Sequence, residues 1–580
     1  MKECSAVPRC VLPILAVLGM VLAFTTVSTP IIAQEAAPAS QEPEKQSTTA
    51  DLPPLPLSPI EKAEKDGTAL HLSLKDITKL ALQNNLDIAI QDTNEQMSQL
   101  KIVAAYGDYD PKLTAQMGVT SQKSANTNLS SFSASSYSKM DRAQWNLTYQ
   151  QAVKTGGTLQ VQWNSSRMDN NTTFSLFTPQ YTGSATVQFT QPLWRNLRID
   201  QTRGNIKIVN LDLQNSDSQF KKTVTDTISS IQSQYWDLVS AIRDYEIKRD
   251  SVKLGQIALR DNRKKVEVGT LAPINITESQ ADLATRELNL ISSEEAIIRQ
   301  ENTLRALISN NRNAEIWTKV IVPTDTPDFK EYKVDLDTAI DTALKNRPEL
   351  EQYDIKLRQS DINEKMTRNS RKWQFDIVGA FGSTGTAGPQ SYRVDSFTGK
   401  QILDAQGNPI PQTPSALVGG IGNAYKTIFT EGFTNWQISF QVQIPLRSRN
   451  LDSQLAQQQV TKRQYLIQRK NQEQSIQVEI RNAIQKLETN RKQVETAKMS
   501  LQLSQEQLDG EQKRFQAGLS ENFRVLDRQN QLAQAENTAL STLINYKKSI
   551  ITLQKAMYIL LESSEFEIAK GSSGNVPDLK

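Results

Sequence analysis

The fold is decided by residues 231–266, which read IQSQYWDLVSAIRDYEIKRDSVKLGQIALRDNRKKV. Every seventh residue of this stretch, beginning with Ile231, is apolar or aromatic. Residues 480–515 repeat the pattern from Ile480, each position 249 residues after its counterpart (480 against 231). A seven-residue apolar repeat keeps one seam of a helix against its neighbours and imposes a left-handed supercoil. The chain therefore predicts two long coiled-coil helices that are related by an internal duplication.

The duplication extends beyond these two helices. Each copy opens with a short amphipathic helix that ends at an asparagine. Pro348 stands where the next helix of the second copy would begin, and proline is favoured at the first helical position. The expected helices are 74–84, 86–108, 201–267 and 273–312 in the first copy and 336–346, 348–372, 449–516 and 521–561 in the second. In each copy the second and fourth helices together nearly match the third in length, so we expect them to meet end to end beside it.

Alternating apolar and polar residues predict strands between the helices. The expected strands are 112–120, 144–152, 158–166 and 185–192 in the first copy and 374–382 and 436–445 in the second. Long connections at 121–143, 168–183 and 383–434 contrast with the tight turn at 154–157, a topology typical of bacterial membrane barrels. Six strands are fewer than the roughly eight of the smallest such barrels, so several chains would share one barrel. Whether the hairpin 144–167 joins that barrel stays open.

The chain ends differ in composition from the repeats. Lys2, Arg9 and the apolar run that follows have the order of a secretory signal peptide, with cleavage expected after Ala33. Cys4 and Cys10, the only cysteines of the sequence, lie in this segment, so no disulfide or cysteine metal site is expected in the mature chain. The expected divisions are a signal peptide at 1–33, a flexible Pro/Ser/Glu-rich leader at 34–70, a first repeat at 71–325, a second repeat at 326–565 and a tail at 566–580.

Composition disfavours several classes of function. The chain has 66 basic and 63 acidic residues, a near balance that argues against a nucleic-acid surface. His71 is its single histidine, so a histidine-rich metal site is excluded and a Ser-His-Asp triad could be built only on this residue, which reads as an ordinary residue at a helix entry. No phosphate-binding glycine loop is evident either. We therefore expect a protein that is not an enzyme and that has no catalytic, cofactor or metal site.

The duplicated order resembles the TolC family of outer-membrane efflux channels over about residues 70–565. The resemblance rests on the helices ending at Asn84 and Asn346, the strands ending at Pro192 and Pro445, and the Val-Gly and Ala-Gly turns after the long helices. It implies a mainly α fold, in which a long α-helical barrel joins a membrane β-barrel that is completed by a homotrimer. It also implies a passive exit duct for tripartite efflux or type I secretion, in the outer membrane of a diderm bacterium and extending into the periplasm. The implied partners are two further copies of the chain, outer-membrane lipid, a periplasmic adaptor (membrane fusion) protein and an inner-membrane transporter of the RND, ABC or MFS type.

The resemblance further implies functional residues at the helix tips. The turns that would contact the adaptor are Val268, Gly269, Thr270 and Leu271 in the first copy and Ala517, Gly518, Leu519 and Ser520 in the second. The family narrows its pore nearby with acidic side chains, and Asp527 matches one of these positions. Arg524 and Asn275 stand where other acids are common, and Glu278 and Glu521 are nearby. The candidate constriction residues are therefore Asp527, Arg524, Glu278 and Glu521.

Two other interpretations stay open at this stage. A periplasmic coiled-coil scaffold or adaptor would also be secreted and carry helical hairpins, although the alternating strands and the tryptophans in or beside them argue against it. A secreted enzyme is a third class, for which no catalytic residues are evident. Drugs, metal ions, metabolites and secreted proteins are all conceivable cargoes of a channel, and the sequence does not choose among them.

Overall fold

The computed structural model describes residues 57–125, 137–171, 175–395, 400–431 and 433–563. The predicted signal peptide at 1–33 and the tail at 566–580 lie outside these residues, as does most of the leader. The leader prediction is wrong at its end, because α1 (Pro59–Lys65) and the start of β1 (Ala69–Leu72) fall within it. Ser58 and Glu61 form a capping box that starts α1, with the Ser58 Oγ accepting from the Glu61 amide at 3.1 Å.

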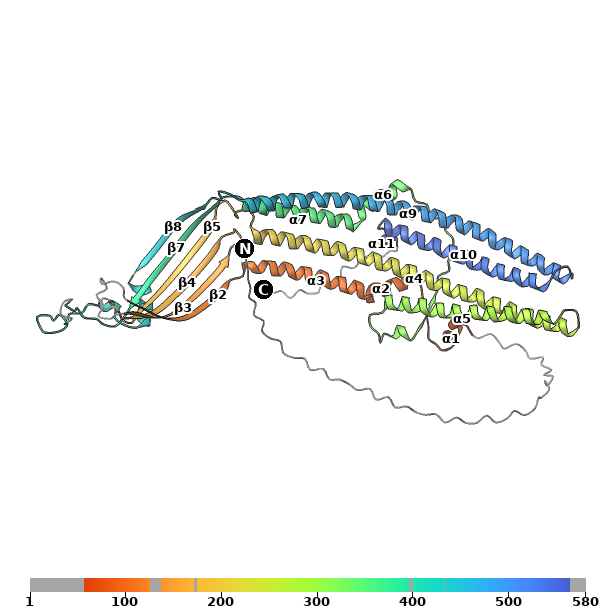
Figure 1. Ribbon diagram of the computed structural model, residues 1–580, viewed down its shortest axis with the longest axis horizontal. Coiled ribbons are helices and arrows are strands. Elements are labelled where there is room, and N and C mark those ends of the chain that lie inside the picture. Colours follow the sequence, from red (N-terminus) through yellow and green to blue (C-terminus); the bar gives the residue numbers. More distant parts are fainter. Residues whose placement is uncertain (1–56, 126–136, 172–174, 396–399, 432, 564–580) are drawn as a thin grey trace, which may run out of the picture. The chain divides into compact units, whose positions relative to one another are not determined.

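Two long helices dominate the structure (Figure 1). They are α4 (Gln201–Glu267) and α9 (Arg449–Gln516), which have the ranges predicted from the sequence. The shorter helices of the two copies are α2 (Leu74–Asn84), α3 (Leu86–Tyr106), α5 (Ile274–Ile308), α6 (Leu336–Asn346), α7 (Pro348–Ser370) and α10 (Asn522–Ala556). At 1.5 Å per residue each long helix is ~100 Å long.

The shorter helices pair with the long ones as broken partners. In the first copy α3 and α5 both pack along α4, and in the second α7 and α10 both pack along α9. The α3–α5 break is closed by Asn85, whose Nδ2 donates to the Leu307 carbonyl at 2.8 Å. The Oδ1 of the same side chain caps the N-terminus of α3. Asn85 therefore joins the last turn of α5 to the first turn of α3.

The heptad seams form the core of the helical part. Ile231, Leu238 and Ile480 are fully buried, and Leu487 is nearly so. Burying an aliphatic side chain of this size contributes about 1.5–3 kcal/mol. Val266, Leu501 and Phe515 are the seam residues that are only partly buried. None of the helices in the described part of the chain is both long and apolar enough to span a membrane.

Six antiparallel strands make one sheet at one end of the helices (Figure 1). They are β2 (Lys112–Ala125), β3 (Tyr137–Ala152), β4 (Thr158–Asn170), β5 (Gln180–Pro192), β7 (Gln374–Ala387) and β8 (Thr434–Gln443), in that spatial order. The hairpin whose place the sequence leaves open is β3–β4, inside this sheet. The strands run further than predicted toward the long connections, where Ser, Thr and Asn replace the apolar residues that mark a strand.

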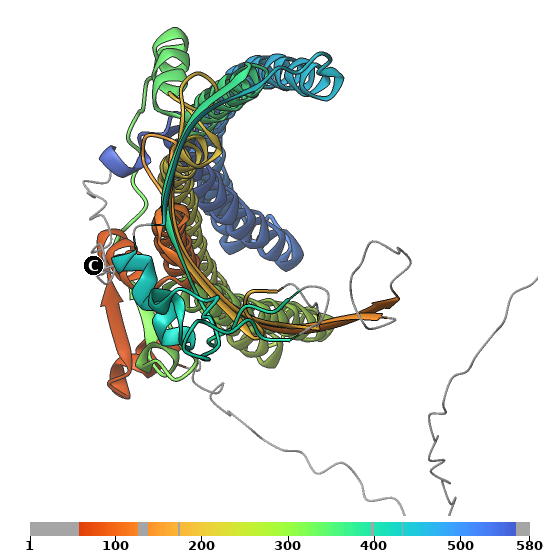
Figure 2. The ribbon, with the colours of Figure 1, turned by 90° about the vertical axis from the view of Figure 1, so that its left-hand side faces the viewer.

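The sheet has one apolar and one polar face because successive side chains alternate. Val161, Val187 and Phe381 lie side by side on the apolar face and are exposed. Gln162, Thr186 and their neighbours form the opposite face. A helix at residues 421–430 packs on the apolar face, over Gly183 and Gly385. Figure 2 shows this helix on the convex side of the sheet, so the apolar face is the convex one.

The prediction of one long loop over 383–434 is wrong. β7 continues to Ala387, and a helix, α8 (Ile421–Thr430), lies near the other end of this stretch. Ala424, Thr427 and Ile428 are its buried residues, at helical spacing. The glycines and prolines around it hide this short period in the sequence. A second unexpected element is a parallel pair between β1 and β6 (Val320–Pro323), strands of only four residues each.

Candidate functional site

The turn after α4 is a Schellman motif with Gly269 in the left-handed conformation (φ 75°). The Gly269 amide donates to the Val266 carbonyl at 3.0 Å, and the Thr270 amide donates to the Lys265 carbonyl at 2.9 Å. These two bonds satisfy carbonyls that a helix end leaves free. The Thr270 hydroxyl adds a third bond to Lys265 at 2.9 Å.

The turn after α9 repeats this geometry. Gly518 has a φ of 77°. Its amide donates to the Phe515 carbonyl at 3.1 Å, and the Leu519 amide donates to the Arg514 carbonyl at 2.9 Å. The Ser520 hydroxyl bonds the buried Glu511 carboxylate, which ties the turn to the helix it leaves. The two tip turns, 268–271 and 517–520, are therefore built alike, as their sequence repeat predicts.

Each tip turn presents one large apolar side chain to solvent. Val268 is 73 % exposed and Leu519 is 80 % exposed, whereas the neighbouring Leu271 is half-buried. Lys265 places its ammonium 4.2 Å from the centre of the Phe515 ring, so the ends of α4 and α9 are in contact.

The four candidate constriction residues do not form one cluster within the chain. Glu521, Arg524 and Asp527 follow one another along the exposed side of the first turns of α10, while Glu278 is exposed on α5. Asp527 accepts a hydrogen bond from the Gln531 amide at 2.8 Å. Within the described residues no hydrogen bond or ion pair joins Glu278 to any of the other three.

A buried ion pair near the tips was missed from the sequence. Arg286 of α5 is 5 % exposed and pairs with Asp282 at 2.7 Å. Its guanidinium also donates to the Ser251 carbonyl of α4 at 2.9 Å and to the Gln529 side chain of α10 at 3.2 Å. Asp282 accepts in turn from the Asn530 amide at 3.2 Å. This cluster joins both copies, and nothing in a helix of mixed charges distinguishes one buried arginine from its exposed neighbours.

A carboxylate with an altered pKa lies further along α10. Glu536 lines a cavity of about 520 Å³ between α4, α9 and α10. Burial raises the pKa of Glu536 above its ordinary value, and the Asp250 carboxylate adds to the effect. Among the described residues no group of three His, Cys, Asp or Glu side chains is placed to hold a metal ion.

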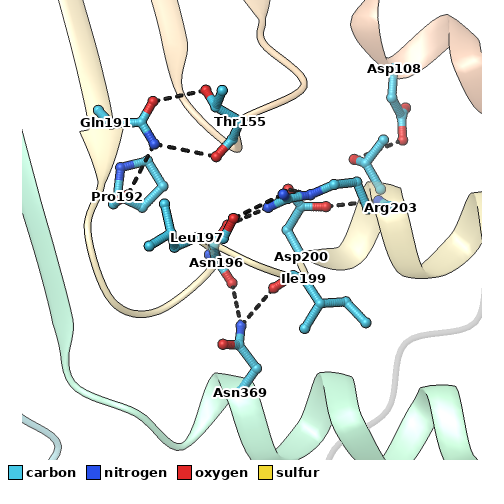
Figure 3. Close-up of polar contacts among 11 residues, drawn as sticks. Asp108, Thr155, Gln191, Pro192, Asn196, Leu197, Ile199, Asp200, Arg203 and Asn369 are labelled. Atoms are coloured by element: carbon cyan, nitrogen blue, oxygen red, sulfur yellow. Dashed lines mark hydrogen bonds and ion pairs between the residues drawn. The ribbon is translucent and has the colours of Figure 1, made fainter.

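The junction between sheet and helices is built around Pro192, the last residue of β5 (Figure 3). Gln191 bridges to the β3–β4 turn, accepting from the Thr155 hydroxyl at 2.8 Å and donating to the Thr155 carbonyl at 3.2 Å. Proline has no amide to continue the ladder, so the strand ends while its last polar side chain stays bound.

Arg203 holds the segment that follows Pro192. Its guanidinium donates to the Leu197 carbonyl at 2.9 Å and to the Asn196 carbonyl, and it pairs with Asp200 at 2.9 Å (Figure 3). Asp200 also caps α4 by accepting from the Arg203 amide at 2.7 Å. Asn369 of α7 donates to Asn196 and to Ile199, at 3.0 and 2.8 Å. The segment between β5 and α4 is therefore held against α7 of the second repeat.

The second junction, at Pro445, is built more simply. Pro445 follows β8, and the Ser448 side chain makes no cap hydrogen bond to α9. Leu446 is 97 % exposed, and Arg371 pairs with Asp452 at 2.9 Å across the start of the helix. Both prolines therefore stand at the change from strand to helix, but within the described residues only the first is held by a polar network.

The comparisons with known proteins agree with this architecture. The model of the family described as "Outer membrane efflux protein" matches residues 154–310 and 339–557. Among solved structures, the Campylobacter jejuni CmeC outer membrane channel is 16 % identical, with a TM-score of 0.57 over 84 % of this chain and 86 % of that one. The outer membrane protein VceC of Vibrio cholerae is 12 % identical, with a TM-score of 0.57 over 83 % and 95 %. A search of curated proteins finds no match.

The two kinds of comparison carry different weight. Identities of this size show a shared fold and nothing more, whereas the family model covers well over half of the sequence. The predicted fold class is confirmed, a duplicated α-helical barrel with a β portion. The scaffold or adaptor alternative is excluded by the family match. The chain belongs to the outer membrane efflux protein family and is a passive exit duct of tripartite efflux, located in the outer membrane and extending into the periplasm.

Proposed function

We propose that the chain works as a homotrimer in which three sheets close one barrel. The sheet has two free edges, β2 and β8, and nearly every residue of both strands is exposed. An exposed edge of 10 or 14 residues presents a row of unpaired backbone groups, which favours pairing with another chain. Because six strands alternate in direction, β8 of one copy would meet β2 of the next in antiparallel order.

Uncovered helix seams support the same assembly. Ile90 and Met97 of α3 are exposed seven residues apart, and so are Ile291 and Ile298 of α5. Val460 of α9 is exposed together with Ile467, also seven residues later. The α3 and α5 seams lie on one side of α4, and α9 lies beyond α7 and α10 on the other. Heptad spacing of bare apolar residues on both outer helices is what a neighbouring copy would bury.

The extra hairpin gives this trimer a wide barrel. Three sheets of six strands make eighteen, against the twelve usual in the resembled family. With strands ~4.8 Å apart and tilted by ~40°, eighteen strands enclose a ring about 36 Å across between backbones, compared with about 24 Å for twelve. The polar inner face lined by Gln162, Thr186 and equivalent residues would then border a water-filled exit.

The helix tips would form the entrance. We assign the tip turns 268–271 and 517–520 to the periplasmic adaptor, as the family resemblance implies, because both turns are fixed by backbone hydrogen bonds and lie at the end of the long helices remote from the sheet. Three copies would bring Asp527, Glu521 and Arg524 of α10 around the threefold axis, with Glu278 on the neighbouring α5. The buried Arg286–Asp282 pair, which bonds α4 and α10, would hold α10 against α5 in the closed entrance.

The transporter and the cargo follow from the partners rather than from this chain. An inner-membrane transporter of the RND, ABC or MFS type would supply the energy, since a passive duct has no source of its own. The CmeC and MtrE structures are described as outer membrane channels, which agrees with such a system without choosing the class.

The proposed trimer depends most on one observation, the two unpaired edges of the sheet at β2 and β8. Native mass spectrometry of the detergent-purified chain tests it, together with current recordings in planar bilayers. A particle of three chains that conducts ions is the expected result. A conducting particle of another size would contradict the trimer, and a monomer without conductance would contradict the shared barrel as well.

A further inference from the structure

Helix α8 lies against the outside of the sheet. Figure 2 shows it on the convex side of the curved strands, away from the long helices. It contacts β5 and β7 most closely. At ten residues it is about 15 Å long, and it ends just before β8 begins at Thr434.

Glycines let α8 approach the sheet closely. A Cβ added to Gly385 of β7 would lie 1.9 Å from the Ala424 carbonyl oxygen, so a side chain there would displace the helix. A Cβ on Gly183, the cross-strand partner of Gly385, would meet Tyr425 at 3.0 Å and Ile428 at 3.1 Å. The helix therefore has a seat that is built into two neighbouring strands.

Polar contacts fix the helix in this seat. The Tyr425 hydroxyl accepts from the Trp145 indole at 2.8 Å and donates to the Ser165 hydroxyl at 3.0 Å. At the other end the Ser383 hydroxyl donates to the Ile428 carbonyl at 2.6 Å. Strands β3, β4 and β7 all contribute to these bonds, which makes α8 a fixed part of the sheet surface.

The seat lies where the apolar face of the sheet ends. On β7 this face carries Phe375, Ile377 and Phe381, a span of ~20 Å along the strand, and then Ser383 and Gly385 under the helix. Outer-membrane barrels have an apolar band ~25 Å tall with aromatic residues at both borders. Trp163 stands at this border, stacked on Phe429 with ring centres 6.4 Å apart.

The outward side of α8 is apolar and basic. Phe429 is 77 % exposed, and the exposed Lys426 is one turn away on the same side. Phe433, just beyond the helix, is half exposed. A helix with an aromatic and a lysine on its free side is typical of segments that lie in the plane of a membrane interface.

We propose that α8 is an interfacial helix that binds outer-leaflet lipid. Phe429 and Phe433 contact acyl chains, and the Lys426 ammonium reaches the phosphate level of the headgroups. The proposal rests on the shared barrel proposed above, whose apolar sheet face would meet lipid, and on continuity: the outward side of α8 extends that face at the end remote from the periplasmic helices. The helix thus anchors each copy at the outer border of the membrane.

Spin labels at position 429 test the proposal. Phe429→Cys is made in a chain that also carries Cys4→Ser and Cys10→Ser, labelled with a nitroxide and reconstituted in dioleoylphosphatidylcholine vesicles. Molecular oxygen concentrates in lipid and a nickel chelate in water, so their collision rates with the label report its surroundings. Met117→Cys, 84 % exposed on the apolar sheet face, is the lipid control, and Leu519→Cys, 80 % exposed at the tip, is the aqueous control.

The expected result is a severalfold excess of oxygen over nickel collisions at position 429, close to that at 117. A value like that at 519 would place α8 in water and overturn the proposal. A label shielded from both reagents would also overturn it, since another protein surface would then cover the helix. Phe433→Cys repeats the measurement if the label at 429 disturbs the stacking on Trp163.

Discussion

The Arg347 guanidinium donates through Nε to the Ala556 carbonyl at 2.8 Å. Arg347 is the residue just before α7, and Ala556 is the last residue of α10. Asn85 and Leu307 make the equivalent contact in the first copy, also at 2.8 Å. Each copy therefore splices two short helices into one rod through a single side chain. In the second copy that side chain is charged, 9 % exposed and paired with Glu479 at 2.7 Å.

Replacing this arginine should loosen the splice. We expect Arg347→Ala to destabilise the protein by about 3 kcal/mol, because the Ala556 carbonyl loses its donor and the carboxylates of Glu479 and Glu349, 2.7 and 3.7 Å from the guanidinium, lose an ion pair. Urea unfolding in detergent at a fixed protein concentration measures the effect. Arg358→Ala, an exposed arginine on the same helix α7, serves as the control and should change stability by less than about 0.5 kcal/mol. Equal effects of the two variants would show that the splice contributes nothing.

The second tip turn depends on a left-handed glycine. At a φ of 77° we expect Gly518→Val to strain the turn by at least 1–2 kcal/mol, although a Cβ there would meet no other atom within 4 Å. The Leu519 amide should exchange hydrogen faster in a peptide covering 510–522, and export by cells should fall while the barrel stays assembled.

Gly510→Ala, inside the exposed part of α9, is the matched control for the turn. It has open space around it and no positive φ, so it should be neutral or stabilise by about 0.5–1 kcal/mol. Unchanged exchange and normal export in the Gly518→Val protein would contradict the assignment of this turn to the adaptor.

The entrance should respond to removal of one carboxylate. If three copies of Asp527 narrow it, Asp527→Ala should raise single-channel conductance in planar bilayers and weaken the preference for cations, because a ring of negative charge is lost. Asp337→Ala removes an exposed carboxylate at the start of α6 and should leave both quantities as they are. Conductance and selectivity unchanged by Asp527→Ala would remove this residue from the constriction.

Glu536 should make stability depend on pH. Its pKa is raised from the ordinary value of 4.5, so the folded state binds more protons than the unfolded state, and the free energy of unfolding falls as pH rises from 4.5 through the raised pKa. Glu536→Gln should remove that loss, giving a protein more stable than the parent at pH 7 but not at pH 4.

The pH comparison is made by thermal unfolding at both pH values. Glu506→Gln, with the same change of charge at an exposed site on α9, should not reproduce the effect. A Glu536→Gln protein that is less stable than the parent at pH 7 would show that its carboxylate is stabilised, rather than penalised, by its surroundings.

Most of the fold could be predicted from long periodic patterns in the sequence. The seam from Ile231 is repeated over many turns, so one irregular residue does not hide it, and α4 ends at Glu267, one residue after the last seam position. The tip glycines were equally clear, since only a left-handed residue ends both helices in this way.

What the sequence did not reveal depends on contacts between distant segments. Arg286 and Arg203 look like any other arginine on a polar helix face, and their partners lie on other elements. The β1–β6 pair is too short for a period to be visible. Helix α8 is one short amphipathic segment among glycines and prolines, and its seat exists only because Gly183 and Gly385 are neighbours in the folded sheet.

The central claim, that three copies close one barrel through β2 and β8, is tested most directly by disulfide crosslinking between these edges. Met117→Cys on β2 is combined in turn with Trp436→Cys, Ile438→Cys or Phe440→Cys on β8, which all lie on the apolar face, in a chain with Cys4→Ser and Cys10→Ser. Gln116→Cys, on the opposite face of β2, replaces Met117→Cys in the control. We predict that at least one pair forms a covalent species of three chains on oxidation and that the control pairs do not. Only monomers with every pair, or a ladder that continues beyond three chains, would contradict the closed trimer.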